Sequence, residues 1–120
     1  MKTENTKAQM RKGILEYCIL LVLQNRDQYV SDIIENLEES KMIVVEATLY
    51  PMLTRLKNEG YLGSRWEESQ QGPPRKYYEL TQTGRIFLDE LENAWNELVD
   101  TVYTINARKN VPSLHSTEIK

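Results

Sequence analysis

Residues 46–81 read EATLYPMLTRLKNEGYLGSRWEESQQGPPRKYYELT, and this stretch holds a helix pattern followed by a hairpin pattern. Three leucines recur at helical spacing and Gly60 follows as a typical helix stop, which predicts a helix from about Glu46 to Glu59. Two segments rich in strand-forming residues then flank a Gly-Pro-Pro tip at 72–74, which predicts a β-hairpin with a long loop. A helix joined to a projecting hairpin is the second half of a winged helix-turn-helix.

Further helices are expected on both sides of this stretch. The apolar pattern over 10–23 predicts a helix buried on several sides, and Ser31 is the expected N-cap of a second helix after a turn at 25–28. After the hairpin, Thr81 or Thr83 is expected to cap a long last helix. We therefore expect a mainly α fold with a small β-hairpin, namely a winged helix-turn-helix plus a long C-terminal dimerisation helix.

Size and composition are those of a small globular protein, with 120 residues of which 40% are hydrophobic and 28% charged. We expect a winged-helix domain over 8–81, a dimerisation helix over 82–108 and a flexible tail over 109–120, with residues 1–7 frayed. The longest apolar run, 17–23, is too short to cross a bilayer, and no signal peptide is visible. These features predict a cytoplasmic protein without a membrane partner.

Little in the sequence suggests metal, cofactor or enzyme chemistry. The single cysteine, Cys18, lies in an apolar run and is expected to be a buried small hydrophobe rather than a reactive thiol. The lone His115 lies in a polar tail without neighbouring ligands, so no metal site is expected. No nucleophile–base pair, glycine-rich phosphate loop or carboxylate cluster is visible, and we expect neither a cofactor nor an enzyme.

The net charge of −3 conceals an uneven distribution along the chain. Residues 81–108 hold two basic and five acidic side chains, whereas residues 41–80 hold six basic and five acidic ones. The helix expected in the middle carries small, hydroxyl and amide groups opposite its leucines, and base edges and phosphates accept such groups. Trp66, Tyr77 and Tyr78 are expected mainly to pack on the strands. The residues expected to contact DNA are Ala47, Thr48, Tyr50, Thr54, Arg55 and Asn58 on the helix, and Arg65, Arg75 and Lys76 on the hairpin.

A winged helix can also serve as a protein–protein interaction module without specific DNA binding. Such a module needs no basic or hydroxyl groups on the wing and third helix, where this chain has Arg65, Arg75, Lys76 and Thr54. A gel shift that weakens with salt would separate the two functions.

The last helix carries an apolar seam whose members are spaced alternately three and four residues apart, as in a coiled coil. A partner subunit is the simplest cover for so long a seam, although packing on the chain's own first helix is a compatible alternative. The seam residues expected at a homodimer interface are Leu88, Leu91, Trp95, Leu98, Val102 and Ile105.

The hairpin and helix motifs together resemble those of the PadR family of transcriptional regulators, over roughly residues 10–105. The single C-terminal helix is similar to the short branch of that family. The motifs that carry the resemblance are EATLYP at 46–51, Leu53, RL at 55–56, EGYL at 59–62, GPPRKYYELT at 72–81 and Gly84.

This resemblance implies a homodimeric repressor that leaves a pseudo-palindromic operator when a small molecule binds. It also implies that Trp95 is a platform for flat aromatic ligands, with Tyr17 and Val99 lining the same pore; the alternative for Trp95 is an ordinary core aromatic. One departure is that Tyr29-Val30-Ser31 replaces the Tyr-Gly-Tyr run of many members, which argues against a phosphate contact from that turn.

Overall fold

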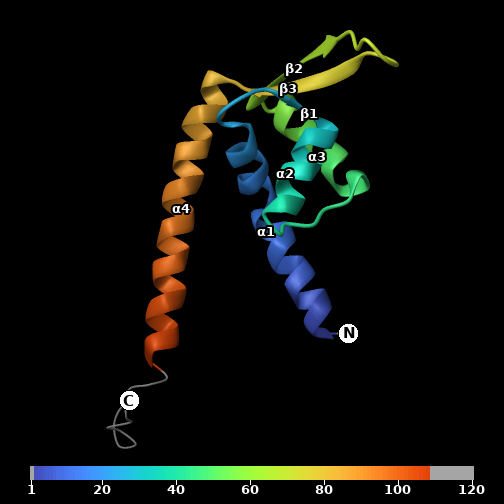
Figure 1. The fold of residues 1–120 in the computed structure, drawn as a ribbon. Helices are drawn as coiled ribbons and strands as arrows, with labels where there is room; N and C mark the ends of the chain where they lie inside the picture. The colour runs from blue at the N-terminus through green and yellow to red at the C-terminus, as the bar shows by residue number, and fades with distance from the viewer. Residues whose placement is uncertain (1, 109–120) are drawn as a thin grey trace, which may run out of the picture. The chain divides into compact units, whose positions relative to one another are not determined.

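The computed structural model describes residues 2–108 and is mainly helical with one small antiparallel sheet, as expected (Figure 1). Two compact units are present: the first ends at Asp89 and the second begins at Glu90. The tail over 109–120, including His115, lies outside the described residues. The elements are α1 (Lys2–Leu23), β1 (Gln28–Tyr29), α2 (Val30–Glu39), α3 (Glu46–Asn58), β2 (Leu62–Glu67), β3 (Arg75–Leu80) and α4 (Gln82–Ala107).

The core of the first unit is built from one apolar face of each of the first three helices. In α3 the three leucines predicted to point inward are fully buried, and each such side chain contributes about 1.5–3 kcal/mol relative to leaving it exposed. The buried residues of the helices are Leu15, Ile19, Leu20 and Leu23 in α1, Val30, Ile33 and Leu37 in α2, and Leu49, Leu53 and Leu56 in α3. The sheet covers this core with Leu62, Tyr78 and Leu80.

The sheet has three strands in the order β1–β3–β2, where the sequence predicted a two-stranded hairpin. The additional strand, β1, pairs Gln28 with Tyr78 and Tyr29 with Tyr77. Gln28 is 2% exposed, its Nε2 donates to the carbonyl of Val22 at 2.7 Å, and its Oε1 accepts from a side-chain amide on α2 at 2.6 Å. A satisfied buried amide thus fixes a strand that is too short to show an alternating pattern.

Two predicted helix starts were wrong. Tyr29, in an extended conformation, is the N-cap of α2 in place of Ser31, because pairing of β1 with β3 already fixes the backbone there. At the N-terminus, residues 2–7 are helical rather than frayed, with Glu4 in the first turn and the hydroxyl of Thr6 donating to the carbonyl of Lys2 at 3.1 Å. An acidic residue in the first turn favours that early start.

The end of α3 and the beginning of α4 are joined by a close junction. Gly60 has a φ of +90°, as expected of a residue that ends a helix, and its carbonyl accepts from the Thr81 hydroxyl at 2.7 Å. The Thr81 oxygen also accepts from the backbone N–H of Gly84 at 2.9 Å, so Thr81 is the cap of α4. Gly84 lies directly against the backbone of Tyr61, whose ring stacks on Phe87 at 4.0 Å between centroids.

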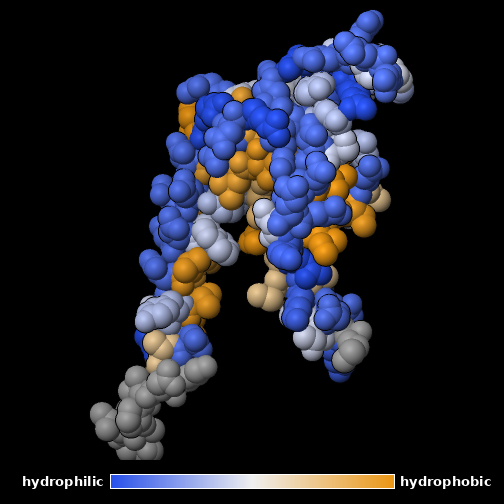
Figure 2. Space-filling model, viewed as in Figure 1, coloured by the Kyte–Doolittle hydropathy of each residue, from blue (hydrophilic) through white to orange (hydrophobic). Residues whose placement is uncertain are grey.

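The predicted seam of α4 divides between the two units. Leu88 is buried in the first unit, whereas Leu91, which is half-buried, belongs to the second. The rest of the seam is exposed: Trp95 at 38%, Leu98 at 58%, Val102 at 63% and Ile105 at 62%. Figure 2 shows apolar side chains gathered along this part of α4. None of the helices within residues 2–108 has the length and apolar character to span a membrane.

Candidate nucleic-acid interface

The outward face of α3 carries the polar residues that the sequence singled out. Its buried leucines fix the rotation of the helix about its axis, so all six predicted contact residues are exposed. Four of them, namely Tyr50, Thr54, Arg55 and Asn58, line one shallow hollow. Thr48 instead lines a groove beside the N-terminal half of α1.

The wing is the hairpin of β2 and β3, and its two faces differ in chemistry. Because side chains alternate along a strand, the register places Arg65 and Arg75 on the outer face and Trp66 and Lys76 on the inner face, where Tyr78 is buried. The Lys76 ammonium lies 5.7 Å from the ring centres of both Trp66 and Tyr78. The sequence missed that Trp66 is 67% exposed, since a Trp on a strand is usually packed.

A concavity of about 360 Å³ separates the wing from the N-terminal ends of α2 and α3. It brings together Tyr50 of α3 with Trp66, Arg75 and Lys76 of the wing. Two cations beside aromatic surfaces suit a sugar–phosphate backbone, although the carboxylate of Glu46 on the same lining opposes it.

Arg55 is tied to the first helix. One of its Nη atoms lies 2.6 Å from Oε2 of Glu16 on α1, and the other lies 3.6 Å from Oε1 of Glu59. The hydrogen bond that Arg55 donates to Glu16 is the main reason that the pKa of Arg55 is raised. A DNA phosphate would therefore compete with a carboxylate for this guanidinium.

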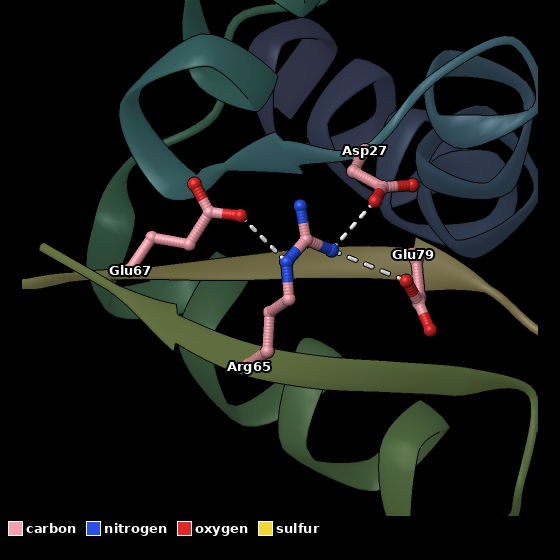
Figure 3. Close-up of polar contacts among 4 residues, drawn as sticks. All are labelled: Asp27, Arg65, Glu67 and Glu79. Atoms are coloured by element: carbon pink, nitrogen blue, oxygen red, sulfur yellow. Dashed lines mark hydrogen bonds and ion pairs between the residues drawn. The ribbon is translucent and has the colours of Figure 1, made fainter.

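Arg65 forms ion pairs with three carboxylates, one more than Arg55 (Figure 3). Its pKa is raised, first by the hydrogen bond to Asp27 and then by that to Glu67. Asp27 precedes β1 and lies far from the hairpin in the sequence, so no local pattern pointed to this contact.

Comparison with known proteins identifies the chain. The sequence profile of the "Transcriptional regulator PadR-like family" matches residues 19–90. The chain belongs to the PadR-like family. Among solved structures, a PadR-like transcription factor from Bacteroides fragilis is 60% identical, with a TM-score of 0.72 over 84% of this chain and 98% of that one. A PadR family regulator from Eggerthella lenta is 31% identical, with a TM-score of 0.76 over 86% of this chain and 87% of that one.

A third PadR structure contains DNA. Bacillus subtilis PadR, in complex with operator DNA, is 26% identical with a TM-score of 0.61, covering 65% of this chain and 46% of that one. Family and fold together make this PadR-like protein a winged-helix, DNA-binding transcriptional regulator and not an enzyme.

The residues linked by resemblance to ligand binding lie in different units. Tyr17 is on α1 in the first unit, whereas Trp95 and Val99 are on α4 in the second. Trp95 and Val99 are four residues apart on one helix and therefore share a face.

Proposed function

We propose that this PadR-like protein is a homodimeric repressor that leaves a pseudo-palindromic operator when a small planar aromatic effector binds. The observation that carries the dimer is the exposed apolar stripe of α4. Leu98, Val102 and Ile105 are each more than half exposed and continue the spacing of a coiled-coil seam. Stripes of this kind mark interaction surfaces, and a second copy supplies a matching seam.

Replacing the seam with charge tests the dimer. Leu98→Asp with Val102→Asp places carboxylates where two apolar seams would meet, and we expect a species of twice 14.1 kDa to become a monomer in light scattering. Asn96→Asp with Thr104→Asp is the matched control, because it also places two new carboxylates on exposed positions of α4 but outside the seam. A wild-type monomer at micromolar concentration would refute the homodimer.

Eight of the nine residues predicted to contact DNA are proposed to bind the operator, and Arg65 is the exception. We propose that the outward face of α3 reads the major groove and that Arg75 and Lys76 neutralise phosphates. Selection of bound fragments from random DNA is expected to return inverted half-sites about one helical turn, or a multiple of it, apart. Recovery of single, unpaired half-sites would contradict dimeric recognition.

Trp95 is the residue proposed to bind the effector, with Tyr17 and Val99 as neighbours in the proposed pore. Trp66→Phe leaves Trp95 as the single tryptophan of the chain, so its fluorescence reports on that site alone. We expect ethidium, a planar aromatic cation, to quench this emission in the DNA-free protein. Trp95→Ala is expected to keep the dimer and DNA binding but to abolish ethidium binding; unchanged ethidium affinity would end this part of the proposal.

A further inference from the structure

The outer face of the wing holds an arginine enclosed by carboxylates from three places in the chain (Figure 3). Arg65 Nη1 lies 2.6 Å from Oδ2 of Asp27, in the segment between α1 and β1, and 3.2 Å from Oε1 of Glu79 on β3. Arg65 Nε lies 2.7 Å from Oε2 of Glu67, on its own strand. The fork of one guanidinium therefore connects the wing to the segment that follows the first helix.

Aromatic contacts extend this arrangement toward the tip of the wing. The Arg65 guanidinium lies 5.3 Å from the ring centre of Tyr77, which meets the ring of Tyr29 edge-on at 5.2 Å. The Arg75 guanidinium in turn lies 4.6 Å from the ring centre of Tyr29. These side chains form one continuous array across all three strands on the outer face of the sheet.

The charge around Arg65 does not suit a DNA contact. One positive charge faces three negative ones within ion-pair distance, so the surroundings of Arg65 are net negative. A phosphate that approached would have to displace existing charge-assisted hydrogen bonds and would meet the repulsion of the carboxylates. Lys76, on the inner face, lies instead against the rings of Trp66 and Tyr78 and lines the concavity beside α3.

We propose that Arg65 is a positioning residue for DNA binding: it holds the wing on the segment before β1 through Asp27, while Lys76, with Arg75, supplies the phosphate contacts of the hairpin. This assignment rests on the DNA-binding function. It replaces the prediction that Arg65, as a basic residue of the hairpin, contacts DNA directly. The guanidinium ties the wing to the segment that leads into β1, and the inner face of the wing then meets the DNA.

The salt dependence of operator binding separates the two roles. Each phosphate contact contributes about 0.9 to the slope of log affinity against log salt. Lys76→Gln removes one contact from each subunit of the proposed dimer, so we expect it to reduce the slope by about 1.8. Arg65→Gln is expected to leave the slope unchanged and to weaken binding about two- to fivefold at every salt concentration, the scale of an exposed ion pair. An equal loss of slope in both variants would show that Arg65 contacts phosphate and would overturn the proposal.

Two further variants test the geometry rather than the charge. Arg65→Lys keeps the charge but loses the fork, and we expect it to weaken binding as Arg65→Gln does; wild-type affinity would contradict a positioning role. Asp27→Asn is expected to add nothing to the loss caused by Arg65→Gln, because both changes break the same contact. Additive losses would show that Arg65 acts without Asp27.

Hydrogen exchange in the DNA-free protein gives a readout that does not depend on operator binding. We expect Arg65→Gln to speed exchange of the paired amides of β2 and β3, and Lys76→Gln to leave them near the wild-type rate. Unchanged exchange in Arg65→Gln would refute the holding role even if its salt slope were unaffected. A wild-type protein that failed to bind operator would instead count against the DNA-binding function.

Discussion

Gly84 offers a sharp test of the packing, because a single methyl group there has no room. A Cβ at this position would lie 2.9 Å from Cδ1 of Leu80 and 3.0 Å from the carbonyl carbon of Tyr61, and closer still to the carbonyl oxygen of Tyr61. The backbone of Tyr61 cannot move aside as a flexible side chain can. Gly84→Ala must therefore push the first turn of α4 away from the end of α3.

The expected loss of stability combines three contributions. Overpacking costs about 1–3 kcal/mol, and the displacement weakens the hydrogen bond from the Thr81 N–H to the Tyr61 carbonyl, at 3.1 Å, by about 1 kcal/mol. Alanine regains up to about 1 kcal/mol of helix propensity over glycine. We expect Gly84→Ala to lower the free energy of unfolding by about 2 kcal/mol, which is a fall of about 1–2 M in the urea midpoint.

Gly13 provides a matched control, since it lies on an exposed part of α1 where an added Cβ meets nothing within 4 Å. Gly13→Ala is expected to raise stability by about 0.5–1 kcal/mol, from helix propensity alone. Urea titrations followed by circular dichroism, at one protein concentration because of the proposed dimer, compare the two variants. If Gly84→Ala stabilises the protein as Gly13→Ala does, the close approach at Tyr61 is refuted.

Three other outcomes can be checked with the same protein. Thr81→Val removes the cap of α4 and its bond to the preceding turn, and we expect a loss of about 1–2 kcal/mol in urea unfolding; a loss below 0.5 kcal/mol would contradict the capping role. Glu16→Gln removes the carboxylate that competes with DNA for Arg55, so operator affinity should rise about two- to fivefold, the scale of an exposed ion pair, and an unchanged affinity would place Arg55 away from DNA. Cys18 is half-buried rather than buried as expected, and this partial burial raises the pKa of its thiol and lowers the thiolate fraction at neutral pH; a disulfide reagent should react with it more slowly than with the urea-unfolded chain, and equal rates would contradict the partial burial.

The sequence predicted those parts of the fold that depend on local patterns. Leu49, Leu53 and Leu56 repeat at the period of a helix, and this alone is enough to orient the polar face of α3. Gly60 and Thr81 are residue types with strong positional preferences at helix ends, and both occupy those ends. The motifs around them also placed the chain in its family.

The parts that sequence reasoning missed depend on contacts between distant segments. β1 has only two residues, and its pairing with β3 is visible only once the sheet has formed. Arg65 has the residue type and the hairpin position of a phosphate contact, yet its partner Asp27 lies in a segment that no spacing rule connects to it. Local charge identified the wing, but it could not show the contacts of Arg65 with Asp27 and of Arg75 with Tyr29, because these partners come from outside the hairpin.

The two neighbouring basic residues of β3 show that the order of residues along a strand, and not only their number and charge, decides what each side chain contacts. Arg75 and Lys76 leave the strand on opposite sides, one stacked on Tyr29 and the other over Trp66. A chain with these two residues exchanged would have the same mass, net charge and hydropathy, yet it would present a planar guanidinium inward and a compact ammonium outward. Whether a strand position is odd or even therefore decides which aromatic ring lies beside each cation, which the number of positive charges alone does not.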